Sequence, residues 1–164
     1  MLVSERFLQA HPYLKESAVV IKGQALATDS KKLYEPASAI ELIGSNMTRR
    51  AAQNAYDQAA VSPKDIQVIE LHDCFTTNEM CALEDLGLSQ HGEAWKLVKN
   101  GGITYPHKSA TNGTSRGWIV NPSGGLISKG HPLGATGIAQ TAELGMFAHT
   151  VSQRIHSRCH LPDN

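Results

Sequence analysis

Ile66-Gln-Val-Ile-Glu-Leu-His-Asp-Cys-Phe-Thr-Thr-Asn-Glu79 is the stretch of this sequence that decides its fold class. Residues 66–71 are a short apolar run that predicts a strand. The strand leads without a spacer into His72-Asp-Cys-Phe75, and a helix begins directly afterwards. A strand that feeds a helix in this way is the repeating unit of α/β folds.

The start of this helix carries its own sequence signal. Thr76 and Glu79 have the spacing of a capping box, in which each side chain satisfies a free backbone N–H of the other's turn. We expect the helix to run to about Leu86 and to end at Gly87, because glycine accepts the left-handed conformation that closes a helix.

The flanking sequence supplies the other elements. It predicts a short, largely buried strand over Ala18–Leu26, a strand over Trp118–Asn121, and helices over Leu2–Ala10 (without a capping residue), Asn46–Ala60 and Ala135–Val151. The order β, α, β, α, β, α predicts a layered α/β fold with a mainly parallel sheet and right-handed crossovers. Gly101–Gly117 is predicted to be a long surface loop.

The helix predicted over Asn46–Ala60 has one small, apolar face. Residues on that face recur at every fourth position: Met47, Ala51, Ala55 and Ala59. Ser45 or Asn46 can cap its start, and Pro63 bars its continuation.

The composition limits the class of protein. The 164 residues are enough for one domain, and 41% hydrophobic with 18% charged residues is typical of a folded globular chain. Fifteen basic residues balance fifteen acidic ones, so we expect no nucleic-acid partner, and no apolar run is long enough to span a membrane. Three cysteines (Cys74, Cys81 and Cys159) are too few and uneven for a disulfide framework and favour a reducing compartment.

The first candidate site is the junction after the strand at 66–71. Sites in open α/β sheets form at the carboxyl ends of strands. Cys74 precedes a helix start, where free N–H groups favour a thiolate, and His72 is close enough to stabilise that thiolate or to donate to a substrate oxygen. A thiol of this kind suits general acid–base chemistry.

The second candidate site is the glycine-rich loop Asn121-Pro-Ser-Gly-Gly-Leu-Ile-Ser-Lys-Gly-His-Pro-Leu-Gly-Ala-Thr-Gly137. Its glycines permit tight turns and close approach of the backbone to a ligand. Pro132 moves His131 out of the helical region, so the loop is predicted to present one imidazole in a fixed direction.

These two motifs resemble those of thiolases. Gly130-His131-Pro132 is similar to the thiolase histidine loop, and His72-Asp-Cys-Phe75 is similar to the variant that the sterol-carrier-protein type carries in place of Asn-Glu-Ala-Phe. The resemblance extends to about Val151. It implies a half-domain of βαβαβαββ type that packs against a second half in αβαβα layers, and this chain lacks the last two strands of its half.

The resemblance also implies roles. His131 would activate a nucleophilic cysteine and, with His72, bind the thioester oxygen, while Cys74 would be the acid–base thiol. Substrate-binding residues would be Asn121, Gly124, Gly125, Gly130 and Pro132.

The implied reaction is thiolysis or Claisen condensation of 3-oxoacyl-CoA with coenzyme A, an acyltransferase step of fatty-acid metabolism without a further cofactor. A homo-oligomer is implied. By analogy with the family we expect the protein in peroxisomes, and in the cytoplasm if it is not imported. The chain ends in Leu-Pro-Asp-Asn and not in a peroxisomal targeting signal of the Ser-Lys-Leu type.

Two departures from the family pattern shape the expected activity. The family's nucleophilic cysteine belongs to the N-terminal half, and nothing before residue 18 can supply it. A polar tail over 153–164 stands where the last strands would be, so we expect a thiolase-like domain over 1–152. The chain alone is therefore predicted to be inactive or weak, and a catalytically silent interaction module is the alternative.

Other interpretations of single residues remain. Cys74 could be a buried core thiol, and Cys81 is predicted to pack in the core. His91 and His107 are predicted to be solvated, and Cys159 lies outside any matching context. The cysteine and histidine spacings do not favour zinc, and the glycines match no nucleotide-binding motif. A sterol or lipid carrier would rest only on the family's usual fusion partner.

Overall fold

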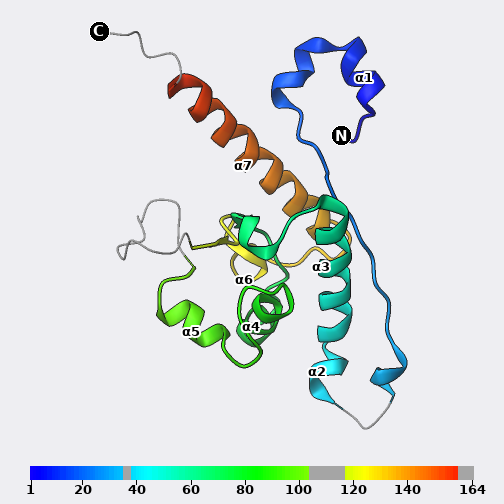
Figure 1. The fold of residues 1–164 in the computed structure, drawn as a ribbon, viewed down its shortest axis with the longest axis vertical. Helices are drawn as coiled ribbons and strands as arrows, with labels where there is room; N and C mark the ends of the chain where they lie inside the picture. Colours follow the sequence, from blue (N-terminus) through cyan, green and yellow to red (C-terminus); the bar gives the residue numbers. More distant parts are fainter. Residues whose placement is uncertain (35–37, 104–116, 159–164) are drawn as a thin grey trace.

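The computed structural model describes residues 1–34, 38–103 and 117–158 and shows a mixed α/β chain with a small sheet (Figure 1). The helices are α1 (Glu5–Ala10), α2 (Ala39–Leu42), α3 (Ser45–Ala59), α4 (Thr76–Asp85), α5 (Ala94–Lys99), α6 (Gly125–Lys129) and α7 (Thr136–Arg158). Short 3₁₀ helices cover Pro12–Ser17, Lys31–Leu33 and Pro63–Asp65, and the strands are β1 (Val68–Ile69) and β2 (Ile119–Val120).

The two strands pair in parallel, with Val68 beside Ile119 and Ile69 beside Val120. The chain between them contains α4 and α5, as a parallel crossover requires. The parallel sheet is thus confirmed, and the strands predicted over 66–71 and 118–121 are confirmed in a shorter form. Because both strands run in the same direction, their carboxyl ends deliver the two candidate loops to one edge of the sheet.

A small apolar core holds this edge in place. Its buried residues are Leu71, Leu83, Leu88 and Ala94. They come from the end of β1, from α4 and its C-terminal turn, and from the start of α5, and the side chains of Trp118 and Val120 pack against them. Burial of this cluster fixes α4 beneath the junction that carries His72 and Cys74.

The strand predicted over Ala18–Leu26 is wrong. The whole segment is described, but it pairs with no other strand, and Val20 and Leu26 are 77% and 90% exposed. It runs extended beside α3 (Figure 1), where the Gln24 N–H donates to Gln58 Oε1 at 3.1 Å. A Cβ atom on Gly23 would overlap the carbonyl oxygen of Ala55, so the glycine permits this close approach. An apolar run shows that a segment prefers burial but not which partner it finds. Of the predicted βαβαβα order, the described ranges contain two strands, β1 and β2.

Helix α3 lies within one residue of its predicted bounds, and its predicted face is half-buried. Its start differs from the prediction, because neither Ser45 nor Asn46 caps it. Gly44, with φ of +84°, is the N-cap residue and provides no side chain. The Ser45 hydroxyl donates instead to Asp85 of α4 at 2.6 Å. The helix ends at Ala60, before Pro63, as expected.

Helix α4 ends as predicted at Gly87, which has φ of +78°. The Leu88 N–H donates to the Leu83 carbonyl at 3.0 Å and closes the last turn. The predicted capping box is wrong, because Phe75 is the N-cap residue and no side chain caps this end. At α1 the opposite holds, since Ser4 Oγ accepts from the Phe7 N–H at 3.2 Å and caps a helix that was predicted to lack a cap.

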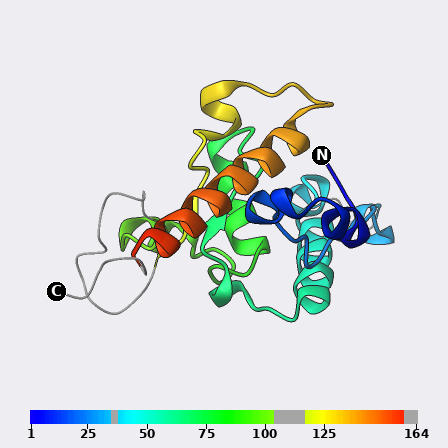
Figure 2. The ribbon, with the colours of Figure 1, turned by 90° about the horizontal axis from the view of Figure 1, so that it is seen from above.

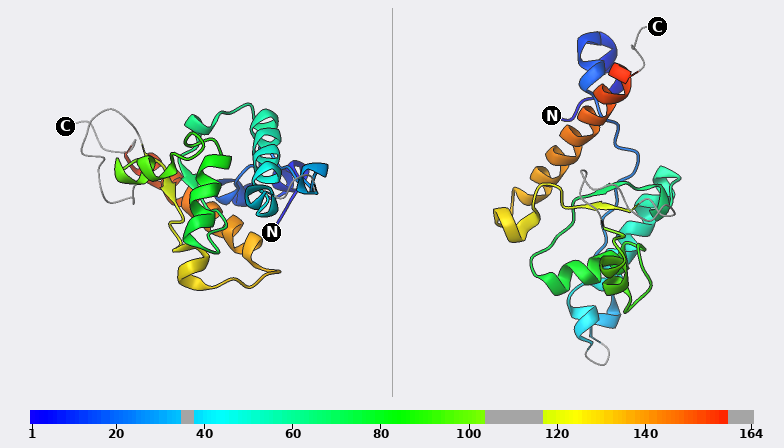
Figure 3. Two further views of the ribbon diagram at one scale, coloured as in Figure 1. Left: turned by 90° about the horizontal axis from the view of Figure 1, so that it is seen from below. Right: turned by 90° about the vertical axis from the view of Figure 1, so that its left-hand side faces the viewer.

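Helix α7 begins close to the second loop and projects from the rest of the molecule (Figure 3). Seen from above, α6 and the first turns of α7 lie along one side of the molecule (Figure 2). The helix continues past residue 152 to Arg158, so the predicted boundary between a domain over 1–152 and a tail over 153–164 falls inside it and stays a prediction. Most of the predicted loop over 101–117, together with His107 and Cys159, lies outside the described residues.

Candidate active site

The structure brings the two predicted imidazoles together. The ring centroids of His72 and His131 are 4.7 Å apart, and the ring planes are nearly perpendicular at 87°. Both residues are exposed, as a pair that receives a substrate must be. The contact joins residues 59 positions apart in sequence and follows from the parallel pairing of β1 with β2.

Cys74 lies in the same loop as His72. Its thiol is free and exposed, which contradicts the alternative of a buried core thiol. Among the contacts of the described residues, none joins Cys74 to either imidazole. Cys81 is half-buried on α4, where burial, then Asp85 and then Glu84 raise the pKa of its thiol. Raising the pKa disfavours the thiolate, so Cys81 suits a packing role.

The direction of the His131 ring is set by a residue that sequence reasoning missed. Nδ1 of His131 lies 2.8 Å from Oγ1 of Thr136, and the Thr136 hydroxyl donates to the Pro132 carbonyl oxygen at 3.2 Å. With that hydroxyl proton engaged, Thr136 Oγ1 is an acceptor for Nδ1–H in the tautomer whose lone pair is on Nε2. The only feature of the sequence that could have pointed to Thr136 is its polar side chain at the start of the helix predicted over Ala135–Val151.

The loop that carries His72 is held by Asn78, also missed from sequence. The Asn78 Nδ2 atom donates to the His72 carbonyl oxygen at 2.6 Å and fastens the junction to the first turn of α4. The carbonyl oxygen of the preceding Leu71 accepts from Gln140 Nε2 of α7 at 2.8 Å. Both bonds restrict the backbone on which His72 sits.

Asn121, predicted to bind substrate, is engaged within the protein. Its Oδ1 accepts from the Leu71 N–H at 2.8 Å, and its own N–H donates to the Ile69 carbonyl at 2.8 Å. Its φ of +46° is unusual for a residue other than glycine, although asparagine tolerates it better than most. The Nδ2 atom is buried and has no hydrogen-bond partner among the residues that the structure describes. A role of Asn121 in substrate binding stays a prediction.

The predicted substrate-binding glycines differ in their surroundings. A Cβ atom on Gly125 would overlap the carboxylate of Asp73, and one on Gly124 would lie 3.0 Å from the side chain of Ser128. Gly130, with φ of +88°, has no atom within 4 Å of such a Cβ. Internal packing thus accounts for the first two glycines, whereas open space adjoins Gly130 next to His131.

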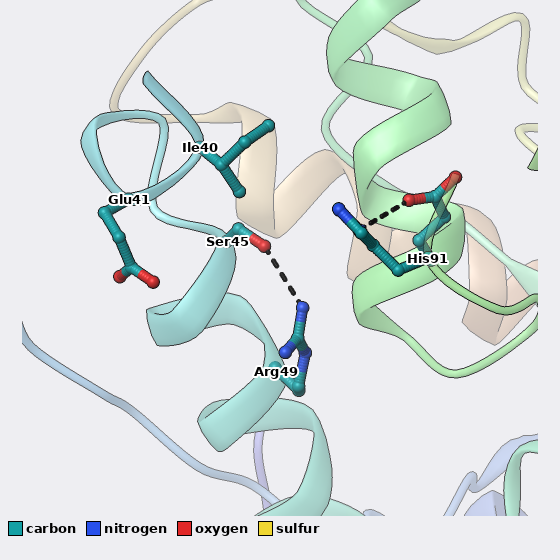
Figure 4. Close-up of a pocket in the computed structure, with 6 residues that line it drawn as sticks. Ile40, Glu41, Ser45, Arg49 and His91 are labelled. Carbon is teal, nitrogen blue, oxygen red and sulfur yellow. Dashed lines mark hydrogen bonds and ion pairs between the residues drawn. The ribbon is translucent and has the colours of Figure 1, made fainter. Parts of the chain in front are cut away.

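A second set of polar residues lines a cavity of about 490 Å³ on the other side of α4 (Figure 4). Its lining residues are Ile40, Glu41, Ser45, Arg49, Glu84 and His91. Arg49 pairs with Asp85 at 3.0 Å, and His91 pairs with Glu84 at 3.1 Å, so His91 is exposed but not merely solvated as predicted. The charge of Arg49 is balanced by Asp85, and neither the His72 junction nor the His131 loop contributes to the lining.

Two further findings concern the described residues only. No group of three or more histidine, cysteine, aspartate and glutamate side chains in them is arranged to hold a metal ion. None of the helices in the described ranges combines the length and the apolar character needed to span a membrane.

Comparison with known proteins identifies the family of this chain. Residues 30–149 match the model of the family described as thiolase C-terminal domain-like. The chain is 48% identical to sterol carrier protein 2 of Bos taurus over 144 residues, which are 88% of this chain and 25% of that protein. The corresponding protein of Homo sapiens is 47% identical over 144 residues, which are 88% of this chain and 24% of that protein.

A more distant similarity joins the chain to an acetyl-CoA acetyltransferase of Methanothermobacter thermautotrophicus. The two are 38% identical over 129 residues, which are 79% of this chain and 30% of that protein. This chain spans about a quarter of the length of the sterol carrier proteins that it matches.

Proposed function

Because this chain belongs to the thiolase C-terminal domain-like family, we propose that it contributes the histidine half of a thiolase active site, which acts on 3-oxoacyl-CoA and coenzyme A by thiolysis or Claisen condensation. The observation that supports this proposal is the contact between the rings of His72 and His131 at 4.7 Å. The nucleophilic cysteine comes from an N-terminal thiolase half that is not among these 164 residues.

His131 begins the reaction. With Nδ1–H engaged by Thr136, the Nε2 lone pair accepts the proton of the nucleophilic thiol. The resulting thiolate attacks the 3-oxo carbon of the substrate. The bond between the second and third carbons breaks, and its electron pair passes to the enolate of acetyl-CoA.

His72, Cys74 and His131 then complete the cycle. Imidazole N–H groups hold the enolate oxygen, which is an electrostatic contribution of roughly 3 kcal/mol per donor. The thiol of Cys74 gives its proton to the second carbon, and acetyl-CoA leaves. A second coenzyme A gives its thiol proton to the Cys74 thiolate and attacks the acyl-enzyme thioester. The acyl group leaves as acyl-CoA, and the nucleophilic cysteine takes its proton back from His131. We assign Gly130, whose surroundings are open, to the path of the substrate, together with Asn121, Gly124, Gly125 and Pro132 in the loop wall.

The partners and location follow the same proposal. We propose that residues 1–152 form the thiolase-like domain, that it assembles with an N-terminal half or in a homo-oligomer, and that it resides in peroxisomes as the family analogy implies.

The test is a complementation assay. The purified chain is assayed for thiolysis of acetoacetyl-CoA alone and after mixing with a matching N-terminal thiolase half. We expect turnover only in the mixture, and its loss with His131→Ala or His72→Ala. His91→Ala is the matched control, because it removes an exposed histidine outside the pair and should leave turnover unchanged. Turnover by the chain alone would place the nucleophile within it and overturn the proposal.

A silent interaction module is the second candidate. Large apolar side chains are exposed on the described residues, among them Leu133 and Ile138, and exposed apolar surface favours association. No turnover in the mixture, together with co-sedimentation of the chain with full-length thiolase subunits, would favour this function.

A further inference from the structure

Asp73 is the buried member of the motif that carries His72 and Cys74. It is 3% exposed, whereas the residues on both sides of it are exposed. A carboxylate withdrawn from water destabilises a protein unless hydrogen bonds compensate for the lost solvation. The hydrogen bonds of Asp73 therefore indicate its role.

The carboxylate accepts from the second loop. Oδ1 accepts from the Leu126 N–H at 2.7 Å, and Oδ2 accepts from the Ile127 N–H at 3.4 Å. These N–H groups belong to the first turn of α6 and have no partner within the helix. The N-cap residue of α6 is Gly124, which has no side chain, so a residue more than fifty positions earlier in the chain provides the cap.

Gly125 is shaped to receive this carboxylate. Its φ is +64°, and a Cβ atom there would overlap both oxygen atoms of Asp73. The aspartate and the glycine thus require each other. Packing against Asp73 is thus a reason within the protein for a glycine at position 125.

A short path of bonds connects Asp73 to His131. Leu126 donates its N–H to Asp73, and its carbonyl oxygen accepts from the Gly130 N–H at 2.8 Å. His131 follows Gly130 directly. The opposite end of the loop is held separately, since Ser123 donates from its N–H and its hydroxyl to Glu70 at 3.0 and 2.8 Å. Asp73 is therefore the contact that joins α6 to the junction after β1, two hydrogen bonds away from the residue before His131.

We propose that Asp73 is a positioning residue that locks α6 against the junction after β1 and so sets the contact between His72 and His131. Its effect on catalysis rests on the function proposed above, whereas its effect on the geometry of the two rings does not. The two can be tested apart.

The geometric test is made on the full chain with carbon-13-labelled histidine. We expect a nuclear Overhauser contact between the His72 and His131 ring protons, and ring-current shifts on both. Asp73→Asn keeps the shape but replaces one acceptor oxygen by a donor that cannot receive an N–H. It should abolish the contact and most of the ring-current shift. Asp85→Asn is the matched control, because Asp85 is also a buried, hydrogen-bonded aspartate but lies at the other end of α4. It should retain both signals.

A second variant covers the case in which Asp73→Asn does not fold. Asp73→Glu keeps the charge and both acceptors but lengthens the side chain, so α6 must move. We expect the His131 ring resonances to shift while those of His91 do not. Unchanged His131 resonances in a folded Asp73→Glu protein, or a retained contact in folded Asp73→Asn, would overturn the proposal.

The catalytic arm uses the mixture of chain and N-terminal half. A displacement on the order of 1 Å lowers rates by roughly 100-fold, so Asp73→Asn should lower kcat by up to that factor with KM nearly unchanged. If the wild-type mixture is inactive, the proposed function fails while the ring measurements still decide the positioning role. An unchanged kcat in the variant would overturn positioning and leave the proposed function standing.

Discussion

The Nδ1 atom of His131 lies 2.8 Å from the Oγ1 atom of Thr136, whose own hydroxyl proton goes to the Pro132 carbonyl oxygen. The arrangement favours the tautomer with the proton on Nδ1. In that tautomer Nε2 is the basic atom of the candidate site.

Replacing Thr136 by valine should impair catalysis more than folding. Valine has the same shape but cannot accept from Nδ1–H, so the ring loses its fixed tautomer. We expect a stability loss of about 1 kcal/mol for the hydrogen bond and a fall in kcat of the complemented enzyme. The nitrogen-15 shifts of the His131 ring should show a mixture of tautomers. Thr136→Ser is the control, because it retains the hydroxyl, and an unaltered tautomer in the valine variant would contradict this role.

Gly125→Ala should destabilise the chain more than Gly130→Ala. Both positions have positive φ, at +64° and +88°, so alanine strains the backbone of both variants by roughly 1–3 kcal/mol. Only at position 125 does the added methyl group also overlap Asp73, which adds roughly 1–3 kcal/mol of overpacking. Urea unfolding of the two variants measures the difference. Equal losses would mean that the loop relaxes away from Asp73.

The carboxyl of Glu79 should make stability depend on pH. Its pKa is raised by burial and then by the negative charge of Asp73. The folded state therefore binds this proton more tightly than the unfolded state. The stabilisation is present below the unfolded pKa and is lost as pH rises through the folded pKa. Glu79→Gln should accordingly gain stability relative to wild type as pH rises from acid to neutral, measured by thermal unfolding across that range.

Asp65 is a control whose pKa is shifted in the opposite direction, so stability should change with pH in the opposite sense. Hydrogen bonds from the Ser62 hydroxyl and then the Ser62 backbone lower the pKa of its carboxyl. Its stabilisation is present above the unfolded pKa and is lost as pH falls through the folded pKa. Asp65→Asn should thus be less stable than wild type at neutral pH and approach it in acid. The same direction of change in both variants would contradict the assignments.

The two partners of the buried Asp85 carboxylate should contribute unequally to the free energy of unfolding. Ser45 donates to it at 2.6 Å from a buried position, so Ser45→Ala should lower the free energy of unfolding by about 2 kcal/mol. The Arg49 side chain is 58% exposed, and solvent screens its ion pair, so Arg49→Met should lower it by about 1 kcal/mol or less. Chemical denaturation of the single variants gives both values, and a larger loss for Arg49→Met would reverse this order.

Local sequence determined several elements of this protein. The four-residue spacing in residues 47–59 predicts α3, and Gly87 ends α4, because helix periodicity and left-handed turns depend on neighbours along the chain. The apolar run before His72 predicts a strand, and the two loops that carry His72, Cys74 and His131 are recognisable from their residues alone. The match of residues 30–149 to the thiolase C-terminal family agrees with those loops.

Tertiary structure decided the rest, because the deciding partners lie far apart in the sequence. The segment over 18–26 has the composition of a buried strand but lies exposed along α3 and pairs with no strand in the part of the chain that the structure describes. The cap of α6 comes from Asp73, the ring of His131 is oriented by Thr136, and the distance between the two imidazoles follows from the register of β1 on β2. Sequence by itself determined which side chains can carry the chemistry. Only the folded chain decided how they face one another, because hydrogen bonds and packing between distant segments set that geometry.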